Sequence, residues 1–530
     1  MKLFFRFLPI AVLIGAVSAP CFSATITGSV KGPEGSPFRG AFVQAQNVKT
    51  RISVLVLSND QGHYRVENLP AGEYRMQIRA IGYSANPQTG VKLADAQNAS
   101  FDFALRKTPV RWSDLNVYQG KKLLPESPSK AAFFRECSIC HSFQTRIAAV
   151  SRDEEGYRDR IRFMQNTMSL GSRFTDKDGD EMAAYFASLF GPDATAPKSP
   201  ENIPGYAETL RPVSSDALGI TYVEYEMPAE SWMPFSAAPG KDGSMWIPNF
   251  GNANRITRLN PKTGETESFK VPFERTAKIH SAAEAPDGSV WATEQGSNRI
   301  ARWDPVTRKI TEYQDFYPRE NGTDRGRKHT LIFDLEGNVW STGTPLSRFN
   351  IKTKEFDHFK EVNVAYGITR DKDGNIWATS SRQDLIVRVD WKTLKLKTWD
   401  IPKDSHARRI AIDPEGIVWV GLYNRGELLR FDPKTETSRQ YPLPGPKATP
   451  YGLGVDSKGN VWYSSFEQDT LGRLDPKTGK ITEYPFPHSE NTIREFFLDA
   501  GGKLWFGTPS NNRVGYIVMP GDEPRKMSRK

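Results

Sequence analysis

The sequence feature that most constrains the fold is a tryptophan that recurs seven times in the second half of the chain. Each copy stands three positions after a glycine, as in Gly459-Asn460-Val461-Trp462, and successive copies are 37 to 49 residues apart. A four-stranded propeller blade has this period, so the repeat predicts a seven-bladed β-propeller over residues 219–519. The repeated residues are Trp246, Trp291, Trp340, Trp377, Trp419, Trp462 and Trp505.

The two ends of the repeat indicate how the ring closes. The first six copies each continue into an outer strand such as residues 480–484, but the seventh copy ends near Met519 without one. Residues 219–225 match the outer-strand pattern and precede the first tryptophan. We expect these two ends to pair, because pairing removes the exposed edges that an open array of blades would present.

One position of the repeat is a candidate ligand site. It lies eleven residues before each tryptophan, where the innermost strand of a blade should begin and face the central channel. A position that only packs would keep one residue type, whereas this one mixes imidazoles, phenols and guanidinium groups, as a site for an anionic or hydrogen-bonding ligand would. We predict that Tyr366, Arg408, Tyr451 and Arg494 bind substrate. The full set is Phe235, His280, His329, Tyr366, Arg408, Tyr451 and Arg494.

The repeat resembles the virginiamycin B lyase family across residues 219–519. That family breaks a depsipeptide ester by elimination, with a His/Glu acid-base arrangement and a magnesium ion. The resemblance implies that His280, His329 and Glu294 are the catalytic residues, and that Mg²⁺ is a cofactor if the lyase interpretation holds. The alternative is a polar propeller mouth that binds a ligand without catalysis. His358 and His488 fall in outer turns and are expected to be solvated.

A second motif, Cys137-Ser138-Ile139-Cys140-His141, is typical of c-type haem attachment. Cys137 and Cys140 would form thioethers to haem c, and the imidazole of His141 would bind the iron. The alternatives are a disulfide redox pair or half of a zinc site, but no second Cys/His pair follows at zinc-site spacing. The sixth iron ligand is expected to be Met168 or Met164, which lie four residues apart and which the sequence cannot separate.

The haem motif lies in residues 108–195, where turn residues thin out and helical periodicity appears. This segment resembles a small single-haem cytochrome c domain. Thr175-Asp176-Lys177-Asp178 is a helix start, and a closing helix is expected to stop at Gly191-Pro192. Ligation by methionine and histidine raises the haem potential, which suits electron transfer rather than oxygen chemistry.

Residues 25–107 alternate apolar and polar side chains in short runs separated by turn residues, which predicts a β-sandwich. Gly62-His63-Tyr64, the run from Leu69 to Tyr74, and Gly82-Tyr83 resemble the carboxypeptidase regulatory-like domain. Members of that family carry no catalytic residues in this module. We therefore expect a scaffold or docking surface here.

The amino terminus predicts export. Lys2 and Arg6 precede an apolar run that ends in small residues, so residues 1–24 read as a secretory signal peptide and the protein as periplasmic or secreted. No later run reaches the roughly 18 to 20 apolar residues that span a bilayer. The net charge of +9 is scattered apart from a basic tail, residues 520–530, so no nucleic-acid partner is expected.

The sequence thus predicts a multidomain protein: an N-terminal β-sandwich, a small all-α cytochrome c domain and a C-terminal seven-bladed propeller, with a proline-rich linker at residues 196–218. The predicted function is an exported c-type haem protein. Its propeller would bind a small molecule, a peptide or a partner, and its cytochrome would pass electrons to a redox partner protein. The alternative is a carbon-oxygen lyase of the virginiamycin B lyase type that opens a cyclic depsipeptide.

Overall fold

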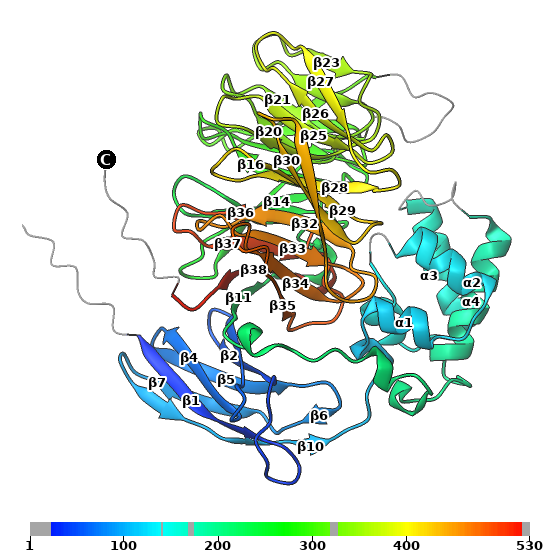
Figure 1. The fold of residues 1–530 in the computed structure, drawn as a ribbon, viewed down its shortest axis with the longest axis vertical. Coiled ribbons are helices and arrows are strands. Elements are labelled where there is room, and N and C mark those ends of the chain that lie inside the picture. Colours follow the sequence, from blue (N-terminus) through cyan, green and yellow to red (C-terminus); the bar gives the residue numbers. More distant parts are fainter. Residues whose placement is uncertain (1–22, 139–140, 168–173, 318–326, 522–530) are drawn as a thin grey trace, which may run out of the picture.

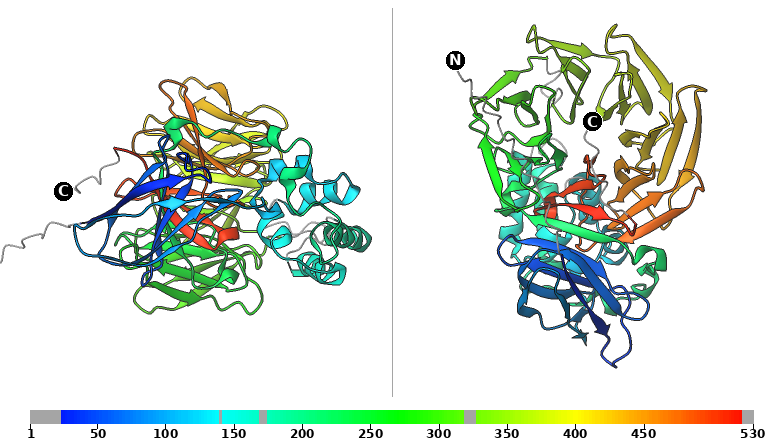
Figure 2. Two further views of the ribbon diagram at one scale, coloured as in Figure 1. Left: turned by 90° about the horizontal axis from the view of Figure 1, so that it is seen from below. Right: turned by 90° about the vertical axis from the view of Figure 1, so that its left-hand side faces the viewer.

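The structure is a computed structural model that describes residues 23–138, 141–167, 174–317 and 327–521. Six four-stranded antiparallel sheets stand around a ring, and each is built from four consecutive strands (Figure 2). The strands of the first three sheets are β12 (Ala238–Pro239), β13 (Met245–Asn249), β14 (Arg255–Leu259), β15 (Thr266–Lys270), β16 (Ile279–Glu284), β17 (Val290–Glu294), β18 (Arg299–Trp303), β19 (Ile310–Gln314), β20 (Leu331–Phe333), β21 (Val339–Ser341), β22 (Leu346–Phe349) and β23 (Phe356–Phe359).

The next three sheets repeat the same arrangement, in which the first strand of each sheet is innermost and the fourth is outermost. Their strands are β24 (Ala365–Arg370), β25 (Ile376–Ser380), β26 (Leu385–Val389), β27 (Leu396–Asp400), β28 (Ala407–Ile412), β29 (Val418–Leu422), β30 (Glu427–Asp432), β31 (Thr437–Pro442), β32 (Pro450–Val455), β33 (Val461–Ser465), β34 (Thr470–Leu474) and β35 (Ile481–Pro485).

The repeated tryptophan has a local structural role in each blade. Its ring is buried on the second strand, and in five blades its indole N–H donates to an aspartate six residues earlier, as Trp419 does to Asp413 at 2.9 Å. The other oxygen of Asp413 accepts two turn N–H groups, including that of Ile417. The glycine three places before the tryptophan occupies the left-handed region in this turn, with a φ of +86° at Gly416.

A seventh sheet closes the propeller and joins it to the N-terminal domain. It contains β36 (Phe496–Leu498), β37 (Leu504–Thr508) and β38 (Arg513–Val518), and β11 (Thr221–Glu226) adds the outer strand by pairing with β38. The other edge of β11 pairs with β3 (Ile52–Leu57), so one eight-stranded sheet runs through both parts of the molecule (Figure 1).

The N-terminal part is a β-sandwich-like domain. Strand β1 pairs with β4 and β8 in one sheet, and β3, β2, β5 and β7 form the other. Apolar side chains such as Ile26, Val43 and Val66 are fully buried between the sheets. The remaining strands are β1 (Ala24–Lys31), β2 (Phe42–Asn47), β4 (His63–Leu69), β5 (Gly72–Arg79), β6 (Tyr83–Ser84), β7 (Gln88–Leu93), β8 (Asn98–Ser100), β9 (Phe103–Ala104) and β10 (Arg106–Lys107).

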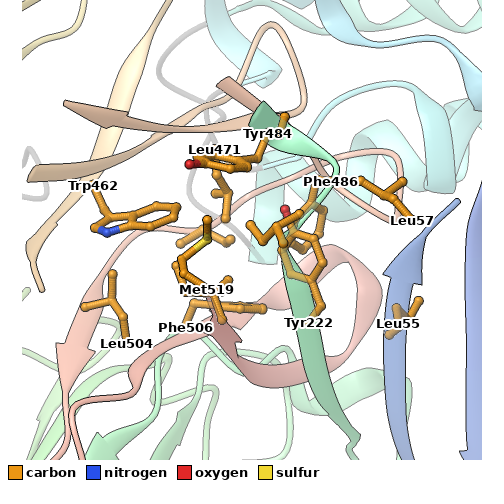
Figure 3. Packing of buried hydrophobic residues seen from close by; sticks show 14 of the residues in the cluster. Leu55, Leu57, Tyr222, Trp462, Leu471, Tyr484, Phe486, Leu504, Phe506 and Met519 are labelled. Atoms are coloured by element: carbon orange, nitrogen blue, oxygen red, sulfur yellow. The ribbon is translucent and has the colours of Figure 1, made fainter. Parts of the chain in front are cut away.

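The junction between sandwich and propeller has its own apolar core (Figure 3). Leu55 and Leu57 of β3 pack with Tyr222 of β11 and with side chains of the sixth and seventh sheets, including Trp462 and Phe506. A polar contact crosses the same junction. The ring of His488 lies 2.7 Å from a carboxylate oxygen of Glu224 and 3.1 Å from a guanidinium nitrogen of Arg79.

These contacts correct one expectation and qualify another. His488 was expected in a solvated turn, but only 8% of it is exposed because the sandwich covers it. His358 is partly buried, with its Nε2 3.0 Å from both carboxylate oxygens of Asp315.

The predicted all-α cytochrome c domain is wrong. The described part of residues 108–195 holds few helices, and two of them have only 7 and 5 residues. Aromatic rings fill the space between these helices: Phe133 packs edge-on against Phe186 at 5.1 Å, and Phe143 stacks on Phe190 at 6.5 Å. The helices are α1 (Val117–Leu123), α2 (Pro128–Ala132), α3 (Glu154–Thr167) and α4 (Asp176–Phe190).

Short helical turns complete the described chain, and none of its helices is long and apolar enough to cross a membrane. The turns are η1 (Trp112–Asp114), η2 (Phe133–Cys137), η3 (Gln144–Ala148), η4 (Pro200–Asn202), η5 (Ala207–Thr209), η6 (Ser215–Ala217), η7 (Glu230–Trp232) and η9 (Pro509–Asn511).

The helical segment, residues 108–195, lies against one mouth of the propeller (Figures 1 and 2). The buried carboxylate of Glu490 accepts the backbone N–H groups of Ser142 at 2.6 Å and Thr145 at 3.0 Å. The backbone N–H of Tyr118 donates to the carbonyl oxygen of Glu467 at 2.9 Å. Glu490 precedes Arg494 by four residues, so the segment docks at the mouth where the innermost strands begin.

Candidate active site at the propeller mouth

The seven predicted channel positions meet in a closed ring, which we call the channel ring. Each member contacts the next around the propeller axis, through ring-to-ring contacts on one side and through arginines placed over aromatic rings on the other. The ring centroids are separated by 5.0 Å from Phe235 to His280, 3.6 Å from His280 to His329 and 4.5 Å from His329 to Tyr366. The distances from the guanidinium carbon to the ring centroid are 4.7 Å for Arg408 and Tyr366, 5.0 Å for Arg408 and Tyr451, 5.0 Å for Arg494 and Tyr451, and 4.9 Å for Arg494 and Phe235.

Four of the blades have a bulge near the start of the innermost strand. The pairing register shifts between Ala407 and Ile410, and similar shifts occur in β16, β24 and β32. An extra residue in a bulge re-aims neighbouring side chains. The residue after a channel-ring position can then also face the channel, as Arg409 does with its guanidinium group 5.3 Å from the Tyr366 ring. The residues that follow the channel-ring positions are Ser236, Ser281, Thr330, Gly367, Arg409, Gly452 and Glu495.

Two members of this second set form a buried ion pair that sequence reasoning missed. Arg409 Nη1 lies 3.0 Å from Glu495 Oε1, and both side chains are almost fully buried. The hydroxyl of Thr330 donates to the same carboxylate oxygen at 3.0 Å. The sequence did contain a signal for this ion pair. At the position after the channel ring, five blades have Ser, Thr or Gly, and only Arg409 and Glu495 are charged, with opposite signs.

The hydrogen bonds of Thr330 assign the tautomer of His329. The Thr330 hydroxyl has one hydrogen, and the Glu495 carboxylate accepts it. His329 Nδ1 lies 3.1 Å from the same hydroxyl oxygen, so Nδ1–H is the donor in that contact. The lone pair of His329 is therefore on Nε2.

Both histidines of the channel ring are neutral. Burial lowers the pKa of His280 well below its usual value, and the nearby guanidinium groups of Arg409 and Arg494 lower it further. Burial also lowers the pKa of His329, with added effects from His280 and from the arginines. His280 Nδ1 is buried without a hydrogen-bond partner in the described structure. Neutral imidazoles next to fixed positive charges can accept a proton but do not hold one in the resting state.

Two tyrosines face the arginines of the channel ring. The hydroxyl groups of Tyr366 and Tyr451 are hydrogen-bonded to each other, and Arg494 Nη1 donates to the Tyr451 oxygen at 2.6 Å. Burial alone would raise the pKa of Tyr451, but the charges of Arg494 and Arg408 outweigh it and lower the pKa. Burial raises the pKa of Tyr366. Tyr451 is therefore the more acidic member of the pair.

A second aromatic tier, also missed from sequence, stands beside the channel ring. Phe250 stacks on Phe235 at 4.1 Å, and Phe466 stacks on Tyr451 at 4.2 Å. Phe250, Tyr423 and Phe466 each follow a repeated tryptophan by four residues, which is the pattern that reveals the tier. The residues of this tier lie where the second strand of a blade ends, and they pack against the channel ring.

The contacts of the Glu294 carboxyl group are with residues other than the two histidines. Ser297 donates to its Oε2 at 2.6 Å, and Glu312 of the outermost strand acts on the same carboxyl. Burial raises the pKa of Glu294 to about 8, with Glu312 adding to the rise. These contacts lie within its own blade. The carboxylate that approaches the histidines is that of Glu495, through Thr330.

The expected haem c and magnesium ion are not supported by the donor set. Among the described residues, no group of three or more His, Cys, Asp and Glu side chains is placed to hold a metal ion. His141 is partly buried, with its Nδ1 2.9 Å from the carbonyl of Ser142, and Cys137 packs against the aromatic core of the helical segment. Met164 is a partly buried residue of α3, and Cys140 and Met168 lie outside the described residues. The haem prediction is wrong.

Comparison with protein families matches two parts of the chain. Residues 351–525 match the virginiamycin B lyase family, and residues 25–106 match the carboxypeptidase regulatory-like domain. Over residues 351–525 the propeller is similar to virginiamycin B lyases. The resemblance seen in the tryptophan repeat and that of the N-terminal domain are both supported, whereas no match supports a cytochrome c domain.

Solved structures share the propeller fold. The structure of a streptogramin B lyase is 21% identical, has a TM-score of 0.52, and covers 58% of this chain and 100% of its own. A virginiamycin B lyase from Staphylococcus aureus is 20% identical with a TM-score of 0.51, and covers 57% of this chain and 99% of its own. Among curated proteins, a gluconolactonase from Zymomonas mobilis is 24% identical over 146 residues, which is 28% of this chain and 38% of that enzyme.

Proposed function

We propose that the propeller is a carbon-oxygen lyase that opens an ester by elimination, with a depsipeptide as the substrate class. The observation that carries this proposal is the neutral His280–His329 pair, with ring centroids 3.6 Å apart, beside a tyrosine and arginine cluster. An elimination needs a base that is free to take a proton and positive charge near the atoms that become negative. The channel ring offers both.

His329 Nε2 is the proposed base. It takes the proton from the carbon next to a carbonyl group, and the electron pair left behind becomes a carbon-carbon double bond. The bond from the neighbouring carbon to the ester oxygen breaks, and that oxygen leaves as part of a carboxylate. Glu495 stabilises the resulting imidazolium through Thr330, because Thr330 links His329 Nδ1 to the Glu495 carboxylate.

The remaining ring residues have supporting roles in this proposal. Arg408 and Arg494 stabilise negative charge that develops on the carbonyl and on the leaving group. Tyr451, whose pKa is lowered, and Tyr366 hydrogen-bond to the substrate. Glu294 has no direct part, since its contacts lie within its own blade.

Mass spectrometry of a cyclic depsipeptide incubated with the protein tests the proposal. Elimination opens the ring without changing the mass and creates an absorbing double bond, whereas hydrolysis adds one water. We expect His329→Gln to abolish opening, and His358→Gln, a histidine at the outer strand β23, to leave it intact. Absence of any ring-opened product from a panel of cyclic depsipeptides, or equal turnover by both variants, would refute the proposal.

We also propose that the chain is exported, with residues 1–24 removed. The charged start, the apolar run and the small residues that follow support this. Sequencing the amino terminus of protein recovered from the periplasm or medium should give a start near Ala24. Recovery only of chains that still begin at Met1 would refute it.

A further inference from the structure

Arg408 is a buried cation that has no carboxylate partner among the described residues. Only 5% of it is exposed, and its guanidinium group lies over the rings of Tyr366, Tyr423 and Tyr451 at 4.7, 4.8 and 5.0 Å. Its Nε atom has no hydrogen-bond partner, and it forms no ion pair with any residue that the structure describes. A buried charge is normally paired, because removing an ion from water costs several kcal/mol.

The neighbouring charges leave this position positive. Arg409 is already paired with Glu495, and the two histidines are neutral. Contacts with tyrosine faces attract a guanidinium group, but a neutral phenol ring carries no net charge and does not neutralise it. The position therefore has unused capacity for one negative charge.

We propose that Arg408, with Tyr366, Tyr423 and Tyr451, forms a subsite for a carboxylate group of a ligand. Guanidinium groups present two parallel N–H donors that match the two oxygens of a carboxylate. Tyr366 and Tyr423 are partly buried, whereas Phe466 stacks on the ring of Tyr451 at 4.2 Å and covers it. The phenol groups of the subsite add donors beside the guanidinium fork.

In the proposed elimination, the subsite would bind the carboxylate product, and this assignment rests on the proposed function. Opening an ester by elimination releases a carboxylate, and Arg408 is the group placed to receive it.

Equilibrium binding of phenylacetate tests the subsite, with phenylacetamide as the uncharged comparison. We expect phenylacetate to bind and phenylacetamide to bind at least about tenfold more weakly, because a hydrogen bond to a charged group contributes about 1.5 to 3 kcal/mol. Ultraviolet absorbance gives a second signal. A carboxylate bound beside Tyr451 opposes the lowering of its pKa by Arg494 and Arg408, so phenylacetate should move the absorbance titration of the tyrosines to higher pH, and phenylacetamide should not.

Two arginine variants locate the effect. Arg408→Met should weaken phenylacetate binding about tenfold or more, whereas Arg439→Met should not, since Arg439 stacks on Tyr441 in the exposed strand β31. If Arg408→Met does not fold, the titration of the native protein decides. Equal binding of acid and amide, or an absorbance titration of the tyrosines that phenylacetate leaves unchanged, overturns the subsite. Carboxylate binding without ester opening leaves the subsite standing and refutes the lyase, while ester opening without carboxylate binding does the reverse.

Discussion

Arg409 and Glu495 form an ion pair at the centre of the propeller, with Nη1 and Oε1 3.0 Å apart, although their strands belong to the fifth and seventh sheets. The pair spans the channel and also holds Thr330 of the third sheet. Three blades that are not consecutive in sequence are thus tied at one point. The same point fixes the orientation of His329, so stability and the proposed chemistry depend on one contact.

Glu495→Gln should destabilise the protein by about 3 kcal/mol, because it leaves Arg409 buried without its counter-charge. The combined change Arg409→Met and Glu495→Leu should recover much of the loss, since two apolar side chains leave no charge unpaired. Chemical denaturation measures both. Glu436→Gln, which removes the exposed partner of Lys397, is the control and should leave the unfolding transition unchanged. A loss in the control equal to that of Glu495→Gln would contradict the prediction.

The histidine pair should make the protein less stable in acid. Both histidines have pKa values lowered by burial, so below about pH 6.5 the unfolded chain binds protons that the folded chain does not. Stability is complete above that pH and is lost as the pH falls toward the folded pKa values. His280→Phe should reduce this loss below about pH 6.5, measured by melting temperature. Parallel pH curves for variant and native protein would show that the histidine does not titrate as expected.

Glu294 should show the opposite dependence on pH. Its pKa is raised to about 8, so the folded chain keeps a proton that the unfolded chain loses at much lower pH. Its contribution to stability therefore falls as the pH rises from about 4.5 to 8 and is constant above that. Glu294→Gln removes the carboxyl group and with it this pH-dependent contribution to stability. The melting temperature of the variant should rise relative to the native protein across that window, and a constant difference would refute the assignment.

Glu490 should hold the helical segment on the propeller mouth. Its carboxylate accepts the N–H groups of Ser142 and Thr145, and Glu490→Ala removes both acceptors. We expect hydrogen exchange to speed up about tenfold in peptides covering η3 (Gln144–Ala148), while the propeller strands stay protected. Glu126→Ala, which removes the exposed partner of Lys130 within the helical segment, is the matched control. Unchanged exchange in η3 would contradict the role of Glu490.

The propeller was predictable because its signal is repeated. Each tryptophan is tied to a turn aspartate and buried between sheets, so the spacing of Trp419 and Asp413 recurs along the chain. The channel ring followed from the same alignment. Its second set of residues was missed, although the same alignment shows Arg409 and Glu495 as the two charged exceptions, because the bulge at Arg409 interrupts the strand alternation on which the prediction relied.

The haem prediction failed for a different physical reason. The residues from Cys137 to His141 form a local pattern, and a local pattern carries no information about the space that the surrounding helices enclose. In the helical segment that space is filled by phenylalanine rings such as Phe133 and Phe186. Residues outside the motif therefore decide the outcome. The proposed domain boundaries at residues 107, 195 and 218 stay predictions.

The placement of β11 between β38 and β3 has a practical consequence for protein engineering. An expression fragment that starts at residue 219 would keep all strands of the ring but would uncover the backbone donors and acceptors of β11 that now face β3. Uncovered strands of this kind recruit other chains. The propeller therefore cannot be expressed alone without an exposed strand edge. A fusion that transfers its channel to another protein would have to include strand β3 or a designed strand in its place.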